Sequence, residues 1–178
     1  MRLFIGIGLP APVAEALAQS ATNLVAPTTT SRIRWTPRAN MHITLSFLGQ
    51  VNEARLAAIE QALTTIRAPR MEVGLSGVGL FERPRVLFAI VKHTPALLAL
   101  AEQVMTAMEA CGFLREDRPY SPHVTLGRSR ERIFTTLDLG RNDPAFHQRF
   151  EAGEFRLYQS LTLPGGAQYE VLRSFPLI

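Results

Sequence analysis

Two short stretches of the chain carry the same pattern, a histidine followed two residues later by a threonine. The first lies in MHITLSFLGQ (41–50), and the second lies in PHVTLGRS (122–129), about eighty residues later. The chain has only four histidines, and the pattern uses half of them. Since an imidazole titrates near about pH 6.5, a neutral ring can accept a proton while a protonated ring donates one at the same pH. His42 and His123 are therefore the candidate acid and base.

The threonines Thr44 and Thr125 complete the two motifs. Because side chains alternate between the faces of a β-strand, each histidine shares a face with its threonine, and the residues between and after them form an apolar face. Threonine hydroxyls can donate to phosphate oxygens and stabilise charge in a transition state. Two such strands related by an approximate twofold would face two imidazoles across a cleft. That geometry suits metal-independent hydrolysis of a phosphodiester, because in-line displacement needs an acid and a base on opposite sides.

The surrounding sequence predicts a mixture of strands and helices that would position these motifs. Strands are expected at 2–9, 33–35, 42–48, 71–81, 86–92, 122–128, 155–163 and 168–175. Helices are expected at 12–25, at 52–67 with Asn52 as the cap, and from Pro95 to about Ala110, with a loop at 26–32 and a poorly patterned region after residue 128. A turn is expected at Gly165 and Gly166.

The order strand, helix, strand occurs twice, and each copy ends in a His-x-Thr motif. Phe4 precedes His42 by nearly the same number of residues as Phe88 precedes His123. This spacing suggests a duplicated lobe, although the same order also arises in unrelated folds, so the similarity can be architectural alone.

Composition limits the possible classes of protein. A chain of 178 residues, 47% hydrophobic and 19% charged, forms one globular domain or two small lobes that share a core. The single cysteine, Cys111, argues against a disulfide framework and a thiolate zinc cluster, and it favours a cytoplasmic location. No apolar run is long enough to span a membrane, and the opening residues read as a strand and a helix rather than a signal peptide.

The basic residues are almost all arginine, since Lys92 is the only lysine among nineteen basic side chains. The planar guanidinium suits bidentate phosphate recognition, and a basic balance favours a polyanionic partner. The base composition of a genome produces the same bias, so it favours RNA no more than that alternative.

A metal site is the other chemical reading of the histidines. Zinc requires three or four ligands, and the chain has no His-x-x-x-His or Cys-x-x-Cys spacing, so no metal is expected. His93 and His147 lie outside the motifs and are interpreted as surface or capping residues.

Four segments together resemble the two-histidine phosphoesterase superfamily, and within it the RNA 2′,3′-cyclic phosphodiesterases formerly described as 2′-5′ RNA ligases. They are RLFIGIGLP (2–10), RWTPRANMHITLSFLG (34–49), RPYSPHVTLGRSR (118–130) and LYQSLTLPGGAQYEVLRSFPL (157–177). The resemblance implies an α+β fold. Residues 1–178 would form one domain of two lobes related by a pseudo-twofold, each an antiparallel-rich sheet with outer helices, around a central cleft.

The resemblance also implies an activity and the residues that perform it. The activity is hydrolysis of the terminal 2′,3′-cyclic phosphate of RNA to a 2′-phosphomonoester, without a metal or other cofactor. His42 would donate a proton to the 3′ oxygen, and His123 would activate water. Thr44 and Thr125 would hold the phosphate, and Arg128 would add a guanidinium. By strand parity Arg128 falls on the opposite face from His123, so this role requires a bulge or the end of the strand.

Aromatic side chains are expected to stack on the bases of an RNA end, and Trp35 and Phe47 are the local candidates. Parity assigns Phe47 to the apolar face of its strand, so we expect it in the core, while Trp35 suits stacking and packing equally.

Two other functions stay open. One is a related two-histidine enzyme that acts on ADP-ribose cyclic phosphate or 2′-5′ oligoadenylates, or that runs the reverse ligation. The other is a non-catalytic module that binds RNA ends, which would not need two proton-transfer groups. A monomer without membrane contact is expected in each case.

Overall fold

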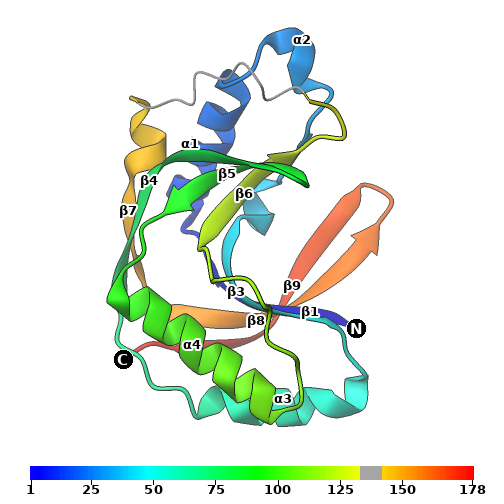
Figure 1. Ribbon diagram of the computed structural model, residues 1–178, viewed down its shortest axis with the longest axis vertical. Helices are drawn as coiled ribbons and strands as arrows, with labels where there is room; N and C mark the ends of the chain where they lie inside the picture. The colour runs from blue at the N-terminus through cyan, green and yellow to red at the C-terminus, as the bar shows by residue number, and fades with distance from the viewer. Residues whose placement is uncertain (133–141) are drawn as a thin grey trace.

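The computed structural model describes residues 1–132 and 142–178 and has an α+β fold. The strands are β1 (Arg2–Gly8), β2 (Arg34–Trp35), β3 (His42–Gln50), β4 (Met71–Glu82), β5 (Arg85–Val91), β6 (His123–Arg128), β7 (Arg149–Ala152), β8 (Glu154–Leu163) and β9 (Gly166–Pro176). The α-helices are α1 (Ala11–Asn23), α2 (Pro27–Thr30), α3 (Leu56–Thr64) and α4 (Pro95–Ala110), and the 3₁₀ turns are η1 (Arg38–Asn40), η2 (Glu53–Arg55) and η3 (Pro144–His147). Figure 1 shows α1 at one end of the molecule and α3 and α4 at the other.

Each strand and helix expected from the sequence is present, with three differences. The short helix α2 occupies the expected loop at 26–32. The expected helix at 52–67 divides into η2 and α3, because Asn52 caps the 3₁₀ turn by accepting a bond from the Ala54 amide at 3.0 Å. The edge strand β7 was not predicted, because its four alternating residues form a short run directly after the poorly patterned region. Part of the poorly patterned region after residue 128 lies outside the described residues.

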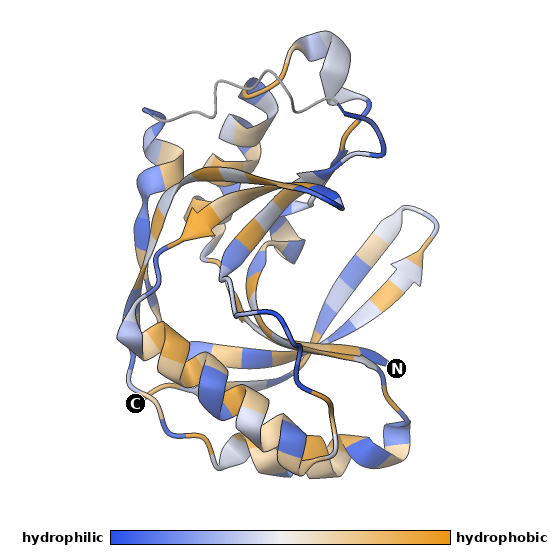
Figure 2. Cartoon of the chain, viewed as in Figure 1, coloured by the Kyte–Doolittle hydropathy of each residue, from blue (hydrophilic) through white to orange (hydrophobic). Residues whose placement is uncertain are grey.

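The helix α4 illustrates how local sequence sets an element. The Thr94 hydroxyl accepts a hydrogen bond from the Leu97 amide at 3.3 Å, and Pro95 occupies the first turn, where no amide donor is needed. The helix stops before Gly112, whose φ of 82° is left-handed. Its buried face packs on β3 and β4, and it is formed by Leu97, Leu100, Ala101, Val104 and Met108. Figure 2 shows the apolar character of this helix and of β4 and β5.

All strand pairs are antiparallel, and the sheet has the order β7-β4-β5-β6-β3-β1-β8-β9, with β2 paired to β6. The two motif strands, β3 and β6, are neighbours in the middle of this order. They are joined by a bridge between Ile43 and Val124, the residues that follow the two motif histidines. Sheet pairing therefore brings the two motifs together from opposite parts of the sequence.

The first motif strand carries a bulge. Along the β1–β3 ladder Gly6 faces Thr44 and Ile5 faces Ser46, so that Leu45 is an extra residue in β3.

The second motif strand carries the same irregularity at the same place. Along the β5–β6 ladder Phe88 faces Thr125 and Leu87 faces Gly127, which leaves Leu126 as the extra residue in β6. In both halves the bulge therefore follows the motif threonine directly.

The two ladders place different residue types opposite the motif threonines. Gly6 faces Thr44 where Phe88 faces Thr125, and Phe4 faces Phe47 instead. The cause is steric. A Cβ at Gly6 would lie 2.7 Å from the Ile43 carbonyl oxygen and 3.3 Å from Cδ2 of His42, so the imidazole occupies the space that a side chain would need.

The strands β8 and β9 form a long hairpin that projects from the body of the molecule (Figure 1). Its turn lies where it was expected, and Gly166 adopts a φ of 120° there. Near the tip, the Asn40 side chain donates a hydrogen bond from Nδ2 to the Ala167 carbonyl oxygen at 2.6 Å. This bond attaches the hairpin to η1, directly before the first motif.

Candidate active site

The motif side chains lie as strand alternation requires. His42 and Thr44 are half-buried on one face of β3, and the residues between and after them, Ile43 and Leu45, are fully buried. In β6 the same alternation leaves His123 and Thr125 half-buried. The bridge between β3 and β6 sets the two pairs beside each other, and the charge of His123 acts on the titration of His42.

The His42 ring is fixed through its Nδ1 atom. Nδ1 lies 2.7 Å from the Asn40 carbonyl oxygen, an acceptor, so Nδ1 carries the proton in the neutral ring. Nε2 is then an acceptor and lies 3.0 Å from Oγ1 of Thr44. The ring also packs at 4.6 Å on Phe4. In this tautomer Nε2 is the nitrogen that can accept a proton.

The His123 ring is held in the same way. Its Nδ1 donates to the Ser121 carbonyl oxygen at 2.8 Å. Ser121 precedes His123 by two residues, just as Asn40 precedes His42 by two residues. Phe81 and Phe88 pack edge-on against the ring at 5.2 and 5.3 Å. Both histidines are therefore anchored to a backbone carbonyl through Nδ1.

The surroundings of His42 change its titration. Burial lowers the pKa of His42 from 6.5 to about 4, opposed by the hydrogen bond to Asn40 and assisted by repulsion from His123. In the substrate-free protein His42 is therefore neutral at pH 7.

The bulges decide which side chains follow the threonines on the cleft face. Phe47, expected in the core, is 56% exposed, and Leu48 is buried in its place. The expectation was wrong because the extra residue, Leu45, inverts the alternation beyond it. Arg128 occupies the equivalent position in β6, and the bulge that its proposed role required is present at Leu126.

One pocket, of about 480 Å³, opens beside His123. Thr44, Phe47 and Arg128 all line it, whereas Thr125 is not among its described lining residues. The charged groups among these lining residues are four arginines and one acid, namely Arg83, Arg115, Arg118, Arg128 and Glu116. The pocket therefore combines an exposed aromatic ring with a positive charge that suits an anion.

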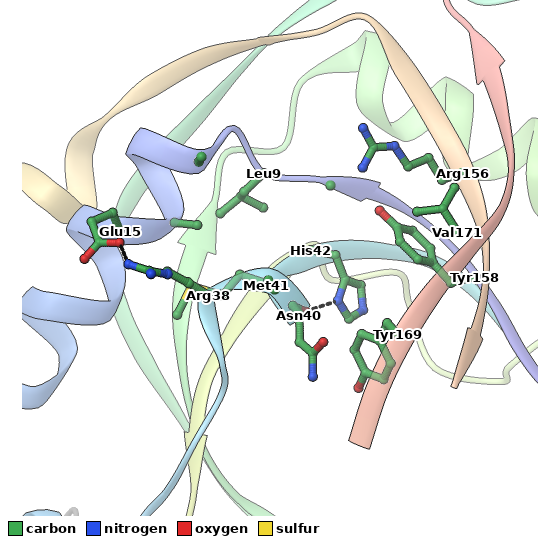
Figure 3. Close-up of a pocket in the computed structure, with 14 residues that line it drawn as sticks. Leu9, Glu15, Arg38, Asn40, Met41, His42, Arg156, Tyr158, Tyr169 and Val171 are labelled. Atoms are coloured by element: carbon green, nitrogen blue, oxygen red, sulfur yellow. Dashed lines mark hydrogen bonds and ion pairs between the residues drawn. The ribbon is translucent and has the colours of Figure 1, made fainter. Parts of the chain in front are cut away.

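A second pocket, of about 430 Å³, opens beside His42. His42, which lines this pocket, is hydrogen-bonded to Thr44, which lines the other. Figure 3 shows His42 in this second pocket between Asn40, Tyr158 and Tyr169.

Trp35 lies outside the described linings of both pockets. Its indole nitrogen donates to the Thr30 carbonyl oxygen at 3.2 Å, and its ring packs over Gly127. This position gives Trp35 a packing role, and it does not bring the ring to the motif histidines.

Several side chains near the motifs were not singled out from the sequence. The Tyr120 hydroxyl donates to the Thr44 carbonyl oxygen at 2.9 Å, and burial raises its pKa, so it stays a donor. Arg156, Tyr158 and Tyr169 reach the His42 pocket from β8 and β9. No local pattern in the sequence marks them, because they reach His42 only through the pairing of β8 with β1, and these two strands are more than a hundred residues apart in the chain.

Within residues 1–132 and 142–178, no group of three or more His, Cys, Asp or Glu side chains could hold a metal ion. None of the helices in these same ranges has the length and apolar character needed to cross a membrane.

Comparisons with known proteins agree with this geometry. The family model described as LigT-like phosphoesterase matches residues 7–88. An RNA 2′,3′-cyclic phosphodiesterase of Archaeoglobus fulgidus is 32% identical over 180 residues, which covers 98% of this chain and 99% of the relative. The enzyme of the same name from Escherichia coli K12 is 29% identical, covering 99% and 96%.

Solved structures agree as well. E. coli LigT complexed with 3′-AMP superposes with a TM-score of 0.85 at 29% identity and covers 99% of this chain and 97% of that one. A crystal structure described as a phosphoesterase gives a TM-score of 0.86 at 28% identity, with the same coverage. By its sequence identity over nearly the whole length, its α+β sheet and its paired motifs, the chain belongs to the LigT-like phosphoesterase family.

Proposed function

We propose that this protein hydrolyses the 2′,3′-cyclic phosphate at the end of an RNA and leaves a 2′-phosphomonoester. The observation that carries the proposal is the pair of imidazoles at the β3–β6 junction, each anchored through Nδ1 to a backbone carbonyl. Two such rings present two Nε2 atoms for proton transfer. The relatives named RNA 2′,3′-cyclic phosphodiesterase, from A. fulgidus and E. coli, support this substrate.

The proposed reaction is an in-line displacement in one step. Nε2 of His123 accepts a proton from water as the water oxygen bonds to phosphorus. The bond between phosphorus and the 3′ oxygen breaks, and that oxygen takes a proton from Nε2 of His42. One water molecule is added in total, and the histidines regain their starting states by proton exchange with solvent.

The donor role of His42 requires that the ring be protonated in the complex. Its pKa of about 4 leaves it neutral before the substrate binds. The cyclic phosphate carries a negative charge, and an anion beside an imidazole raises its pKa. We therefore propose that His42 takes up a proton as the substrate binds.

Neighbouring groups would hold the substrate in the pocket beside His123. Thr44 and Arg128 line that pocket and are the proposed phosphate ligands, with Thr125 from the face that it shares with His123. Phe47 is the proposed stacking platform for the terminal base, because its ring is exposed there.

We further propose that the enzyme is a cytoplasmic monomer that needs no metal or other cofactor. One chain supplies both histidines and both pockets, which supports a monomer. The single cysteine fits a reducing compartment.

The test uses a short RNA that ends in a 2′,3′-cyclic phosphate, incubated with the pure protein in EDTA and followed by phosphorus NMR. A 2′-phosphate product is expected. A 3′-phosphate would reverse the leaving oxygen and contradict the assigned step. An unchanged cyclic phosphate, or activity that EDTA abolishes and a divalent ion restores, would refute the proposal.

Variants then test the roles of the two rings. His42→Ala and His123→Ala should each lower kcat by about 10² to 10⁴, the usual contribution of a general acid or base. Nucleotide affinity should fall less than kcat, because Thr44, Thr125 and Arg128 are the proposed phosphate ligands, although His42→Ala also removes the attraction between the protonated ring and the phosphate. The matched control is His93→Ala, an exposed histidine outside the site, which should keep the wild-type rate. Wild-type turnover in either motif variant would show that the acid and base are misassigned.

A further inference from the structure

Of the residues that line the pocket beside His42, the reaction proposed above uses only His42. We call it the Arg156 pocket, after the side chain that supplies its main positive charge. Its polar and aromatic lining consists of Glu15, Arg38, Asn40, His42, Arg156, Tyr158 and Tyr169. At about 430 Å³ it lies within the size range of small-molecule sites.

The guanidinium of Arg156 is held in place by its neighbours. Nε donates to a carboxylate oxygen of Glu154, which also accepts from the Ser174 hydroxyl at 3.3 Å. The Tyr158 hydroxyl and a terminal nitrogen of the same guanidinium both lie next to Gly8. The Arg156 side chain keeps 37% of its surface exposed. An arginine anchored at one edge and open at the other is preorganised to bind an anion.

The backbone at Gly8 leaves room for the ends of the Arg156 and Tyr158 side chains. A Cβ at Gly8 would lie 2.8 Å from the Tyr158 hydroxyl and 2.9 Å from a terminal nitrogen of Arg156. Any other residue at this position would have a Cβ there, and the Tyr158 hydroxyl and the Arg156 guanidinium would have to shift. The absence of a side chain at Gly8 therefore keeps them beside His42.

An aromatic ring, that of Tyr169, lies on the other side of His42 from Arg156. Tyr169, half-buried on β9, packs edge-on to the His42 ring at 5.3 Å and 81°. The hydrogen bond from Asn40 to Ala167 holds this part of the hairpin against η1. Figure 3 shows Tyr169 and Arg156 on opposite sides of His42. The pocket thus offers an aromatic ring for stacking together with a cation. Proteins use this combination to bind single-stranded nucleic acid.

The charge of the lining fits one phosphodiester. Arg38 is paired with Glu15, and both line the pocket. Arg156 lines it too, whereas its partner Glu154 is not among the described lining residues. The charged lining is thus two arginines against one carboxylate, a surplus of one positive charge.

We propose that the Arg156 pocket binds the nucleotide that precedes the cyclic phosphate, with Arg156 on the internucleotide phosphate and Tyr169 beside the base or sugar. The proposal rests on the function proposed above. His42 and Thr44 line one pocket each and are hydrogen-bonded to each other, so a cyclic phosphate bound beside both would let the preceding nucleotide extend into the Arg156 pocket. The substrate class is therefore the end of an RNA strand rather than a free cyclic mononucleotide.

The experiment compares two substrates, adenosine 2′,3′-cyclic phosphate and the dinucleotide ApA that ends in a 2′,3′-cyclic phosphate. The wild-type enzyme should show a kcat/KM for the dinucleotide at least about tenfold higher, as expected for hydrogen bonds to a charged group. The difference should lie mainly in KM and should shrink as salt is raised.

Two variants locate the preference. Arg156→Gln and Tyr169→Ala should each lower kcat/KM for the dinucleotide at least fivefold more than for the mononucleotide, and Arg156→Lys should restore part of the loss. Because Tyr169 is outside the Glu154 network, it gives an independent reading if Arg156→Gln folds poorly. The control is Arg149→Gln, which removes an exposed arginine paired with Glu72 and should keep the wild-type preference.

The outcomes separate the two proposals. Equal efficiency of wild-type enzyme on both substrates, or an equal loss on both in the two variants, would overturn the Arg156 pocket while leaving the proposed reaction intact. Hydrolysis of neither substrate would overturn the proposed reaction, and the pocket assignment with it.

Discussion

Acidification should destabilise this protein through one residue, and the effect can be calculated. Burial lowers the pKa of His42 from 6.5 to about 4, with a smaller contribution from the charge of His123. The unfolded chain therefore binds a proton at this site near pH 6.5, and the folded protein binds it only near pH 4. The stability contributed by the neutral ring is complete above pH 6.5 and is lost as the pH falls towards 4.

The magnitude follows from the same two values. The pKa of His42 is 6.5 in the unfolded state and about 4 in the folded state. By proton linkage, the free energy of unfolding therefore falls by about 2 kcal/mol between pH 7 and pH 5. Below pH 4 the full loss approaches about 3 kcal/mol. Either amount is a large part of the 5 to 15 kcal/mol that is typical of a folded domain.

The assay is urea unfolding at pH 7 and pH 5, applied to the wild type and to His42→Gln, whose amide does not titrate. The wild type should lose about 2 kcal/mol more than the variant over this interval. His93→Gln, a change at an exposed histidine, should behave as the wild type. NMR titration of the histidine Cε1 protons gives the pKa directly. Parallel losses in wild type and His42→Gln, or a His42 ring that titrates near 6.5, would refute the assignment.

Three further substitutions test the cleft. Phe47→Ala should raise KM for RNA ends by a factor that matches about 1 to 3 kcal/mol of base stacking, with little change in urea midpoint because the ring is 56% exposed; an unchanged KM would remove Phe47 from the site. Gly127→Ala should cost about 1 to 3 kcal/mol in urea unfolding, because its Cβ would lie 2.9 Å from the Trp35 ring. A neutral effect would mean that Trp35 can move. Tyr120→Phe should cost about 1 kcal/mol, because it removes the hydrogen bond to the Thr44 carbonyl; equal urea midpoints would show that this bond contributes nothing.

Local patterns in the sequence were enough to predict most of the elements. Alternation around His42 and His123 predicted the faces of the two motifs, and both motifs lie on strands with buried residues between histidine and threonine. The helix α4 was predicted with its ends, because its cap, first-turn proline and terminal glycine are adjacent to it in sequence. Such features depend on neighbours a few residues apart, so one sequence contains them.

Tertiary structure decided what alternation could not. The bulges at Leu45 and Leu126 arise from pairing with β1 and β5, and they turned Phe47 out of the core and Arg128 into the cleft. A strand reveals its own period but not the register of its partner, so a one-residue insertion that inverts the faces leaves no local sign.

The environment of His42 depended on the fold in the same way. Its lowered pKa requires burial by residues from several strands, and the Arg156 pocket requires β8 and β9 to lie beside β1. The residue types of the site could therefore be read along the chain. Their exposure, their titration and the pocket that each of them lines depend on long-range packing, which only the folded sheet determines.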